Sequence, residues 1–167
     1  MFVVICSCLS PSDRQHYCEC NYDDQEEFLI KDFNNFQDLD SAIECDQRCG
    51  FKRLLVYFYD DSDSTKKMNQ FIELNKTLRN DLNDNFAAVF LKVDDPTPIP
   101  TKGIQGKIKT KGQNNKAFQL KNFKTNSIPM FGIINTSNDS VLGSFGLESN
   151  KEEINSIIVR ALTGSEK

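Results

Sequence analysis

The residues best suited to chemistry in this sequence are six cysteines that fall in three close pairs. The pairs are Cys6 and Cys8, Cys18 and Cys20, and Cys45 and Cys49. The first two pairs have the spacing CxC, whereas zinc sites usually have the spacing CxxC. Metal binding is therefore the weaker interpretation, and no metal or other cofactor is expected. Paired thiols can instead form disulfides in an oxidising compartment, and the sequence leaves their pairing open.

The third cysteine pair follows a helical pattern. Apolar residues recur there at three- and four-residue intervals, which predicts a helix that continues to about Cys49. These apolar residues are Phe36, Leu39, Ala42 and Ile43. Cys45 and Cys49 then lie one turn apart, so that their side chains either meet or simply pack as small apolar groups. The only histidine, His16, is expected to be a solvated residue rather than a catalytic one.

The first 26 residues have no hydrophobic period and predict a tail. Residues 1–10 are similar to the end of a secretory signal, although they lack a basic region and their apolar run is short. Residues 5–8 loosely resemble the lipobox of bacterial lipoproteins, in which Cys8 would carry the lipid anchor. A disordered tail is the alternative. The signal interpretation implies the periplasm or cell envelope; the cytoplasm or an organelle is the alternative location.

Length and composition predict one globular domain. The chain has 167 residues, of which 38% are hydrophobic and 26% charged. We place the domain at residues 27–163, followed by a short tail at residues 164–167. No stretch approaches the ~18 apolar residues of a transmembrane helix. Twenty basic and twenty-four acidic residues give a net charge of −4, so no nucleic-acid partner is expected.

The charge is unevenly distributed along the chain. Residues 19–46 contain ten acids and one base, whereas residues 96–138 contain seven lysines and no acid. These segments are either solvated surfaces or the two poles of a surface that steers a partner. The Pro- and Gly-rich loop at residues 95–112 is a candidate interaction loop, which would meet an acidic partner or the chain's own acidic segment. Its candidate residues are Lys107, Lys109 and Lys111.

The predicted elements alternate between strands and helices. Residues 54–58 and 86–93 are continuous apolar runs, as in strands covered on both faces, and a long helix between them makes a βαβ unit. Ser62 or Asp63 can serve as the N-cap of this helix. After the loop we expect a helix at about residues 114–123, strands at residues 130–134 and 141–145, and a last helix capped by Ser149.

This order predicts an α/β fold with a central mixed sheet of four to five strands and helices on both faces. The predicted core residues come from all of these elements. They are Leu55, Phe58, Met68, Phe71, Val89, Leu91, Phe131, Ile133 and Ile158.

Three stretches between residues 36 and 162 resemble the thioredoxin-like family. Residues 56–58, a polar turn and Lys66-Lys67-Met68 are similar to the family's first central strand, its CxxC turn and the Lys-Met that follows. Ile128-Pro129 before an apolar strand resembles the family's cis-proline. Residues 86–95 and 121–129, around the basic loop, resemble the C-terminal domain of thiol:disulfide interchange proteins of the Bacteroidetes type. The resemblance implies a thioredoxin-like fold.

The chain departs from this family where the reactive cysteines should be. The aligned residues are Ser62, Asp63, Ser64 and Thr65, or Asp63 and Lys66 if residues are counted from Phe58 without a gap. Neither alignment supplies a thiol, and disulfide exchange needs a thiolate to attack a sulfur.

Two functions are therefore compatible with the sequence. The first is a redox-inactive module, within a larger envelope assembly, whose groove binds a protein partner through strand-like backbone bonds. The resemblance places this groove at Ser127, Ile128, Pro129 and Met130. The alternative is a thiol:disulfide oxidoreductase whose dithiol has moved to Cys45 and Cys49 or to the CxC pairs.

Overall fold

A four-stranded mixed sheet forms the centre of the fold. The computed structural model describes Ile30, Phe36, Leu39, Asp40, Ala42, Ile43 and residues 53–99 and 109–164. The strands of the sheet are β1 (Arg53–Tyr59), β2 (Ala87–Lys92), β5 (Met130–Asn135) and β6 (Ser140–Gly146). Their order is β2-β1-β5-β6; β1 and β2 are parallel, and the other two pairs are antiparallel. The predicted mixed sheet of an α/β fold is confirmed.

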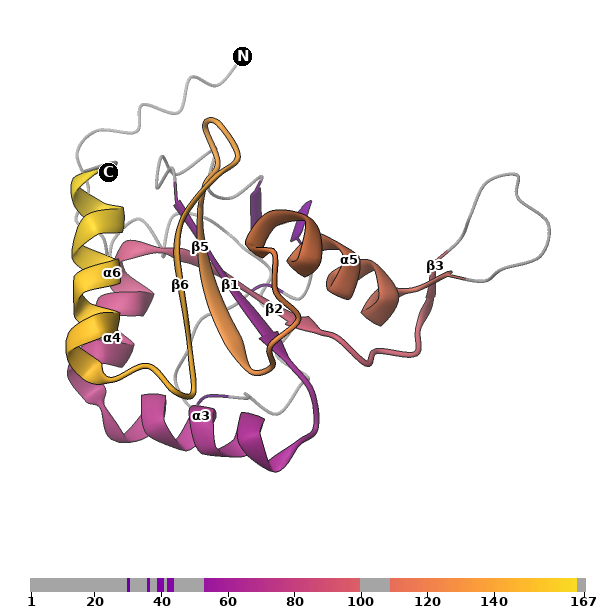
Figure 1. The fold of residues 1–167 in the computed structure, drawn as a ribbon, viewed down its shortest axis with the longest axis horizontal. Coiled ribbons are helices and arrows are strands. Elements are labelled where there is room, and N and C mark those ends of the chain that lie inside the picture. Colours follow the sequence, from indigo (N-terminus) through magenta and orange to yellow (C-terminus); the bar gives the residue numbers. More distant parts are fainter. Residues whose placement is uncertain are drawn as a thin grey trace, which may run out of the picture.

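Helices cover both faces of the sheet (Figure 1). One face packs against α3 (Asp63–Leu74), α4 (Lys76–Asn85) and α6 (Lys151–Thr163), and the other against α5 (Lys111–Phe123) and the residues near Phe36. Successive residues of β1 alternate between these faces, with Leu55 and Tyr57 on the first and Val56 and Phe58 on the second. A strand covered on both sides can be apolar throughout, which explains the continuous run in the sequence.

The predicted core is largely confirmed. Every predicted core residue is buried except Phe71, which is half-buried against the first face. Phe36 extends the sheet beyond β2, because its N–H donates to Ala88 O at 2.8 Å and its carbonyl accepts from Phe90 N at 3.0 Å. Leu39, Asp40, Ala42 and Ile43 are helical, as predicted, but Phe36, which the same pattern placed on the helix, is not, because its backbone pairs with β2.

The connection between β1 and β2 contains two helices, so the prediction of one long helix is wrong. The break lies at Asn75, whose backbone has φ −100° and ψ 74°. Its side-chain Nδ2 donates to Phe71 O at 2.7 Å, and its backbone N–H donates to Ile72 O at 3.2 Å. A polar side chain that takes a carbonyl of the preceding turn favours a helix end over continuation.

The helix after the basic loop begins earlier than predicted. Two short strands, β3 (Pro98–Ile99) and β4 (Lys109–Thr110), pair antiparallel, and α5 begins directly after them instead of near Asn114. Thr110 Oγ1 accepts from Gln113 N and Gln113 Oε1 accepts from Thr110 N, each at 3.2 Å. This capping box fixes the start of the helix.

The N-cap of the last helix is Asn150 rather than Ser149. Asn150 Oδ1 accepts from Glu153 N at 2.9 Å, and Ser149 Oγ instead accepts from Gly146 N at 3.2 Å. At its other end, α6 stops where Gly164 adopts φ 68° and donates to Arg160 O. Such a left-handed residue is the usual end of a helix.

The predicted N-terminal tail and residues 165–167 lie outside the described residues. In the part of the chain that the structure describes, none of the helices has the length and hydrophobicity needed to cross a bilayer.

Candidate functional site

The sheet register brings the polar turn after β1 next to the predicted proline. Phe58 near the end of β1 is paired with Met130 at the start of β5, and Met130 is paired with Gly146 at the end of β6. The residues that follow Phe58 and those that precede Met130 therefore emerge at the same end of adjacent strands. The peptide bond between Ile128 and Pro129 is cis, and Pro129 is buried.

A compact hydrogen-bond network occupies the turn that leads into α3. Asp60 Oδ1 accepts from Ser62 N at 3.1 Å and from Thr65 Oγ1 at 2.9 Å. Ser62 is the N-cap of α3, as predicted, and its Oγ accepts from Thr65 N at 3.3 Å. Thr65 is only 3% exposed. The oxygens of these side chains thus satisfy the N–H groups of Ser62 and Thr65 at the start of the helix.

This turn holds no group that could activate a nucleophile. The residues that the structure describes include neither a cysteine nor a histidine. The Ser62 hydroxyl acts as a hydrogen-bond acceptor for the helix, and the carboxylate of the network, that of Asp60, already accepts two hydrogen bonds. The arrangement supports a helix start rather than covalent chemistry.

The network lowers the pKa of Asp60. Partial burial of the carboxyl raises this pKa, but the hydrogen bonds from Ser62 and Thr65 outweigh burial and hold the pKa below its ordinary value. A carboxyl whose pKa is lower in the folded than in the unfolded chain stabilises the fold at pH values above the unfolded pKa. That stabilisation is lost as the pH falls through the folded pKa.

Replacing Asp60 with asparagine is expected to lower the free energy of unfolding at neutral pH by up to about 1 kcal/mol, since the group is partly solvated. The difference from the unmodified protein should vanish as the pH falls through the native pKa of Asp60, because both side chains are then uncharged. Urea unfolding between neutral and acidic pH measures it. Asp81→Asn on the exposed face of α4 is the matched control, and an equal pH dependence in both variants would contradict the assignment.

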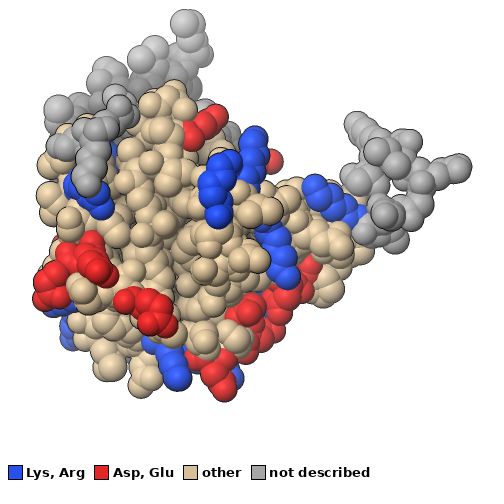
Figure 2. All heavy atoms as spheres, in the orientation of Figure 1, with Lys and Arg blue, Asp and Glu red and all other residues tan. Residues whose placement is uncertain are grey.

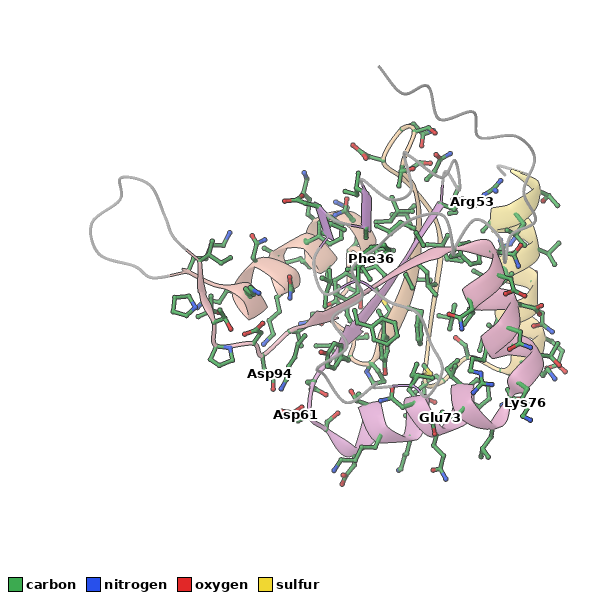
Figure 3. All side chains as sticks on the ribbon, turned by 180° about the vertical axis from the view of Figure 1, so that it is seen from behind. Phe36, Arg53, Asp61, Glu73, Lys76 and Asp94 are labelled. Atoms are coloured by element: carbon green, nitrogen blue, oxygen red, sulfur yellow. The ribbon has the colours of Figure 1, made fainter. Side chains whose placement is uncertain are left out.

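Ion pairs surround the turn. Asp61 Oδ2 accepts from Lys92 Nζ at 2.7 Å, and this bond raises the pKa of the lysine. Asp63 pairs with Lys66 at 3.0 Å on the exposed side of α3. Figure 3 shows Asp61 and Asp94 on the same side of the molecule, where β1 and β2 end. This rim of the site is therefore acidic, with its charges partly compensated by lysines.

The segment before Pro129 is held by side chains, but the backbone N–H and carbonyl of Ile128 have no partner among the described residues. Ser127 N donates to Thr125 Oγ1 at 3.1 Å, and Ser127 O accepts from Gln119 Nε2 at 2.7 Å. Gln119 is fully buried on α5. In contrast, neither the N–H nor the carbonyl of Ile128 forms a hydrogen bond with the described part of the chain. Ile128 thus offers one donor and one acceptor beside the turn.

The structure brings the four predicted groove residues together in one segment. Ser127 is exposed, Ile128 is half-buried, and Pro129 and Met130 are buried. Of the predicted loop lysines, Lys109 and Lys111 are exposed at the start of α5, and Lys107 lies outside the described residues. The cysteines and His16 also lie outside them. These positions are Cys6, Cys8, His16, Cys18, Cys20, Cys45 and Cys49.

Two residues of the site were not predicted from the sequence. Thr125 and Gln119 fix the path of Ser127 through the hydrogen bonds described above. The sequence contains one signal for Gln119, which falls among the inward-facing residues of α5. A buried amide needs a hydrogen-bond partner, so a glutamine at such a position indicates a polar contact inside the fold.

Comparison with known proteins identifies the fold. No protein-family model matches the chain, and no curated protein is significantly similar to it. Among solved structures, a thioredoxin from Thermus thermophilus is 17% identical, with a TM-score of 0.55 over 78% of this chain and 89% of the other. A protein described as DsbH oxidoreductase is also 17% identical, with a TM-score of 0.56 over 90% and 98% of the two chains. The strand order, the helices on both faces and these similarities together show that the chain has a thioredoxin-like fold.

Proposed function

We propose that this chain is a redox-inactive thioredoxin-like module that binds an extended segment of another protein along Ser127, Ile128, Pro129 and Met130. The observation that carries the proposal is that the backbone N–H and carbonyl of Ile128 form no hydrogen bond with any described residue. Its neighbour Ser127 has both backbone groups engaged, so the segment is fixed while the N–H and the carbonyl of Ile128 stay available. An extended peptide can pair with one residue's N–H and carbonyl through strand-like hydrogen bonds.

The turn that faces this segment supports binding without chemistry. A thiolate at the N-terminus of α3 would be stabilised by the helix dipole and by free N–H groups. Here the N-cap is Ser62, whose hydroxyl accepts from Thr65 N, and Thr65 itself is buried. The resemblance to oxidoreductases therefore extends to the position of the turn and not to its reactive groups.

The alternative, a dithiol relocated to Cys45 and Cys49, has a weaker chemical basis. These positions fall in the middle and near the end of the helix predicted from the sequence. The negative end of a helix dipole disfavours a thiolate and so raises the pKa of a nearby thiol. A raised pKa leaves little thiolate at neutral pH to attack a disulfide.

The binding proposal can be tested with a peptide selected from a displayed library of random sequences. The selected peptide is titrated into ¹⁵N-labelled protein while amide shifts and hydrogen exchange are recorded. We expect the Ile128 amide to shift strongly and its exchange to slow, because the peptide carbonyl replaces water as its acceptor. Amides in the exposed half of α6 should remain unchanged.

Two variants make the test specific. Ile128→Asp places a charge beside the binding backbone and should weaken the selected peptide about tenfold or more, which corresponds to the loss of one well-formed hydrogen bond. Val159→Asp on the exposed face of α6 is the matched control and should leave the affinity unchanged. Amide shifts that map to another surface would refute the proposed binding site.

A further inference from the structure

The exposed face of α5 is basic. Lys116, Lys121 and Lys124, with Lys109 and Lys111 at the start of the helix, are all exposed. None of them forms a salt bridge with any described residue, and residues 96–138 contain no acidic residue. Figure 2 shows blue side chains over the position that α5 has in Figure 1. We call Lys116, Leu120, Lys121 and Lys124 the basic face.

The basic face is continuous with the proposed binding segment. Lys124, in a left-handed conformation with φ 57°, ends α5 and begins the short connection to Ile128. Gln119 lies in the same helical turn as Leu120 and Lys121, and its side chain holds Ser127 O. A polypeptide that pairs with Ile128 and extends beyond it would therefore contact the last turns of α5.

We infer that the partner segment is acidic and that its carboxylates contact the basic face while its backbone pairs with Ile128. This inference rests on the proposed function. Lysines that have no salt bridge with a described residue attract carboxylates, accelerate the encounter and disfavour basic partners. Leu120, at 57% exposure, lies among these lysines and gives an apolar side chain of the same segment a point of contact.

Other polyanions fit this surface less well. A duplex nucleic acid is longer than the basic face and would extend to Asp94 and Asp95, which follow β2 beside the start of α5, whereas a short acidic segment can place its carboxylates on the last turns of α5 alone. The exposed residues of α5 include no arginine and no aromatic side chain to grip phosphates or stack on bases. For an anionic membrane, Leu120 is the one large apolar side chain exposed on α5, which is little for insertion.

The test uses three synthetic peptides with the same apolar residues and either glutamate, glutamine or lysine at the remaining positions. Their binding to the full chain is measured by fluorescence anisotropy at low and high salt. We expect the glutamate peptide to bind about tenfold or more tightly than the glutamine peptide at low salt, because three exposed charge pairs add modestly to affinity. The difference should shrink at high salt.

A matched pair of triple variants locates the effect. Lys116→Glu, Lys121→Glu and Lys124→Glu together should abolish the preference for the glutamate peptide. Lys67→Glu, Lys76→Glu and Lys151→Glu on α3, α4 and α6 change the net charge equally, and all three are exposed. This control should keep most of the preference, because screening confines the effect to nearby charges.

Two results would overturn the inference. One is that both triple variants lose the preference for the glutamate peptide equally. In that case, slowed hydrogen exchange of the Ile128 amide in the presence of the glutamine peptide would still support the proposed function. The other concerns two polyanionic probes, duplex DNA and phosphatidylcholine vesicles that contain phosphatidylserine. The inference is wrong if either probe binds the unmodified protein more tightly than the glutamate peptide does, and if only the triple variant on α5 abolishes this binding. That result would assign the basic face to a nucleic acid or a lipid surface.

Discussion

Replacing both Ser62 and Thr65 with cysteine is expected to give the proposed redox-inactive module a disulfide-reducing activity. The Ser62 side chain already lies at the N-cap of α3, and its oxygen accepts from Thr65 N. A thiolate at this position would gain the same N–H group and the favourable end of the helix dipole. A fall in the thiol pKa from 8.5 to near 7 raises the thiolate fraction at neutral pH roughly tenfold.

The two new thiols should play different parts. Ser62 is half-buried, so a thiol at this position can reach a substrate disulfide, whereas Thr65 is 3% exposed and points to Asp60. The carboxylate of Asp60 would keep the thiol at position 65 protonated until the mixed disulfide forms. That thiol then attacks the mixed disulfide and releases the reduced substrate.

Insulin reduction by dithiothreitol, followed by turbidity, measures this activity. The single variants Ser62→Cys and Thr65→Cys are the controls, and each should stay near the background rate because one thiol is missing. The unmodified protein should also stay at background. Reduction by the unmodified protein that is abolished by Cys45→Ser or Cys49→Ser would contradict the redox-inactive module and support the relocated dithiol.

The strands and the start of α3 could be predicted from the sequence. The strands are buried on both faces of the sheet, and the start of the helix depends only on neighbouring residues. The runs that became β1, β2 and β5 are apolar throughout, since helices cover both faces of the sheet. Ser62 follows a strand and precedes an amphipathic helix, which is the usual context of an N-cap. In contrast, the break between α3 and α4 depends on the hydrogen bond from the Asn75 side chain to Phe71 O. The helical pattern of apolar residues continues across Asn75 and therefore does not indicate this break.

The candidate site was predicted only in outline. The resemblance at Ile128-Pro129 located the segment, and the register of Phe58 with Met130 puts it beside the turn. That the backbone of Ile128 has no partner among the described residues could not be predicted. The path of this segment depends on Gln119 of α5, whose side chain donates to the carbonyl of Ser127. Contacts of this kind between distant residues leave no periodic signal in one sequence.

Gly112 explains why the start of α5 was placed too late. The sequence predicts Gly112 at the end of the loop at residues 95–112, but it lies buried in the first turn of the helix. Its N–H donates to Asp95 O at 2.9 Å, and Lys111 N donates to Thr97 O at 2.8 Å. The N-terminus of α5 is therefore held against the chain that leaves β2, a contact that requires the close approach of two backbones.

Replacing Gly112 with alanine is expected to lower the free energy of unfolding by about 1–3 kcal/mol, the usual cost of overpacking. A Cβ at this position would lie 2.6 Å from Val93 O and 2.7 Å from Asp95 N, and backbone atoms held in a turn have little room to move. Urea unfolding should show an earlier midpoint at an unchanged slope.

The sign of the change in the free energy of unfolding shows whether Gly112 is needed for a close backbone contact or occupies an open helical turn. In an exposed helical turn the same substitution would raise stability by about 1 kcal/mol, because alanine favours the helix. Ala117→Gly on the exposed side of α5 is the matched control and should cost about that amount. If Gly112→Ala stabilises the protein, the contact with Val93 and Asp95 is not what positions α5. If it destabilises as expected, the glycine sets the distance between α5 and the sheet, and with it the place of the basic face beside Ile128.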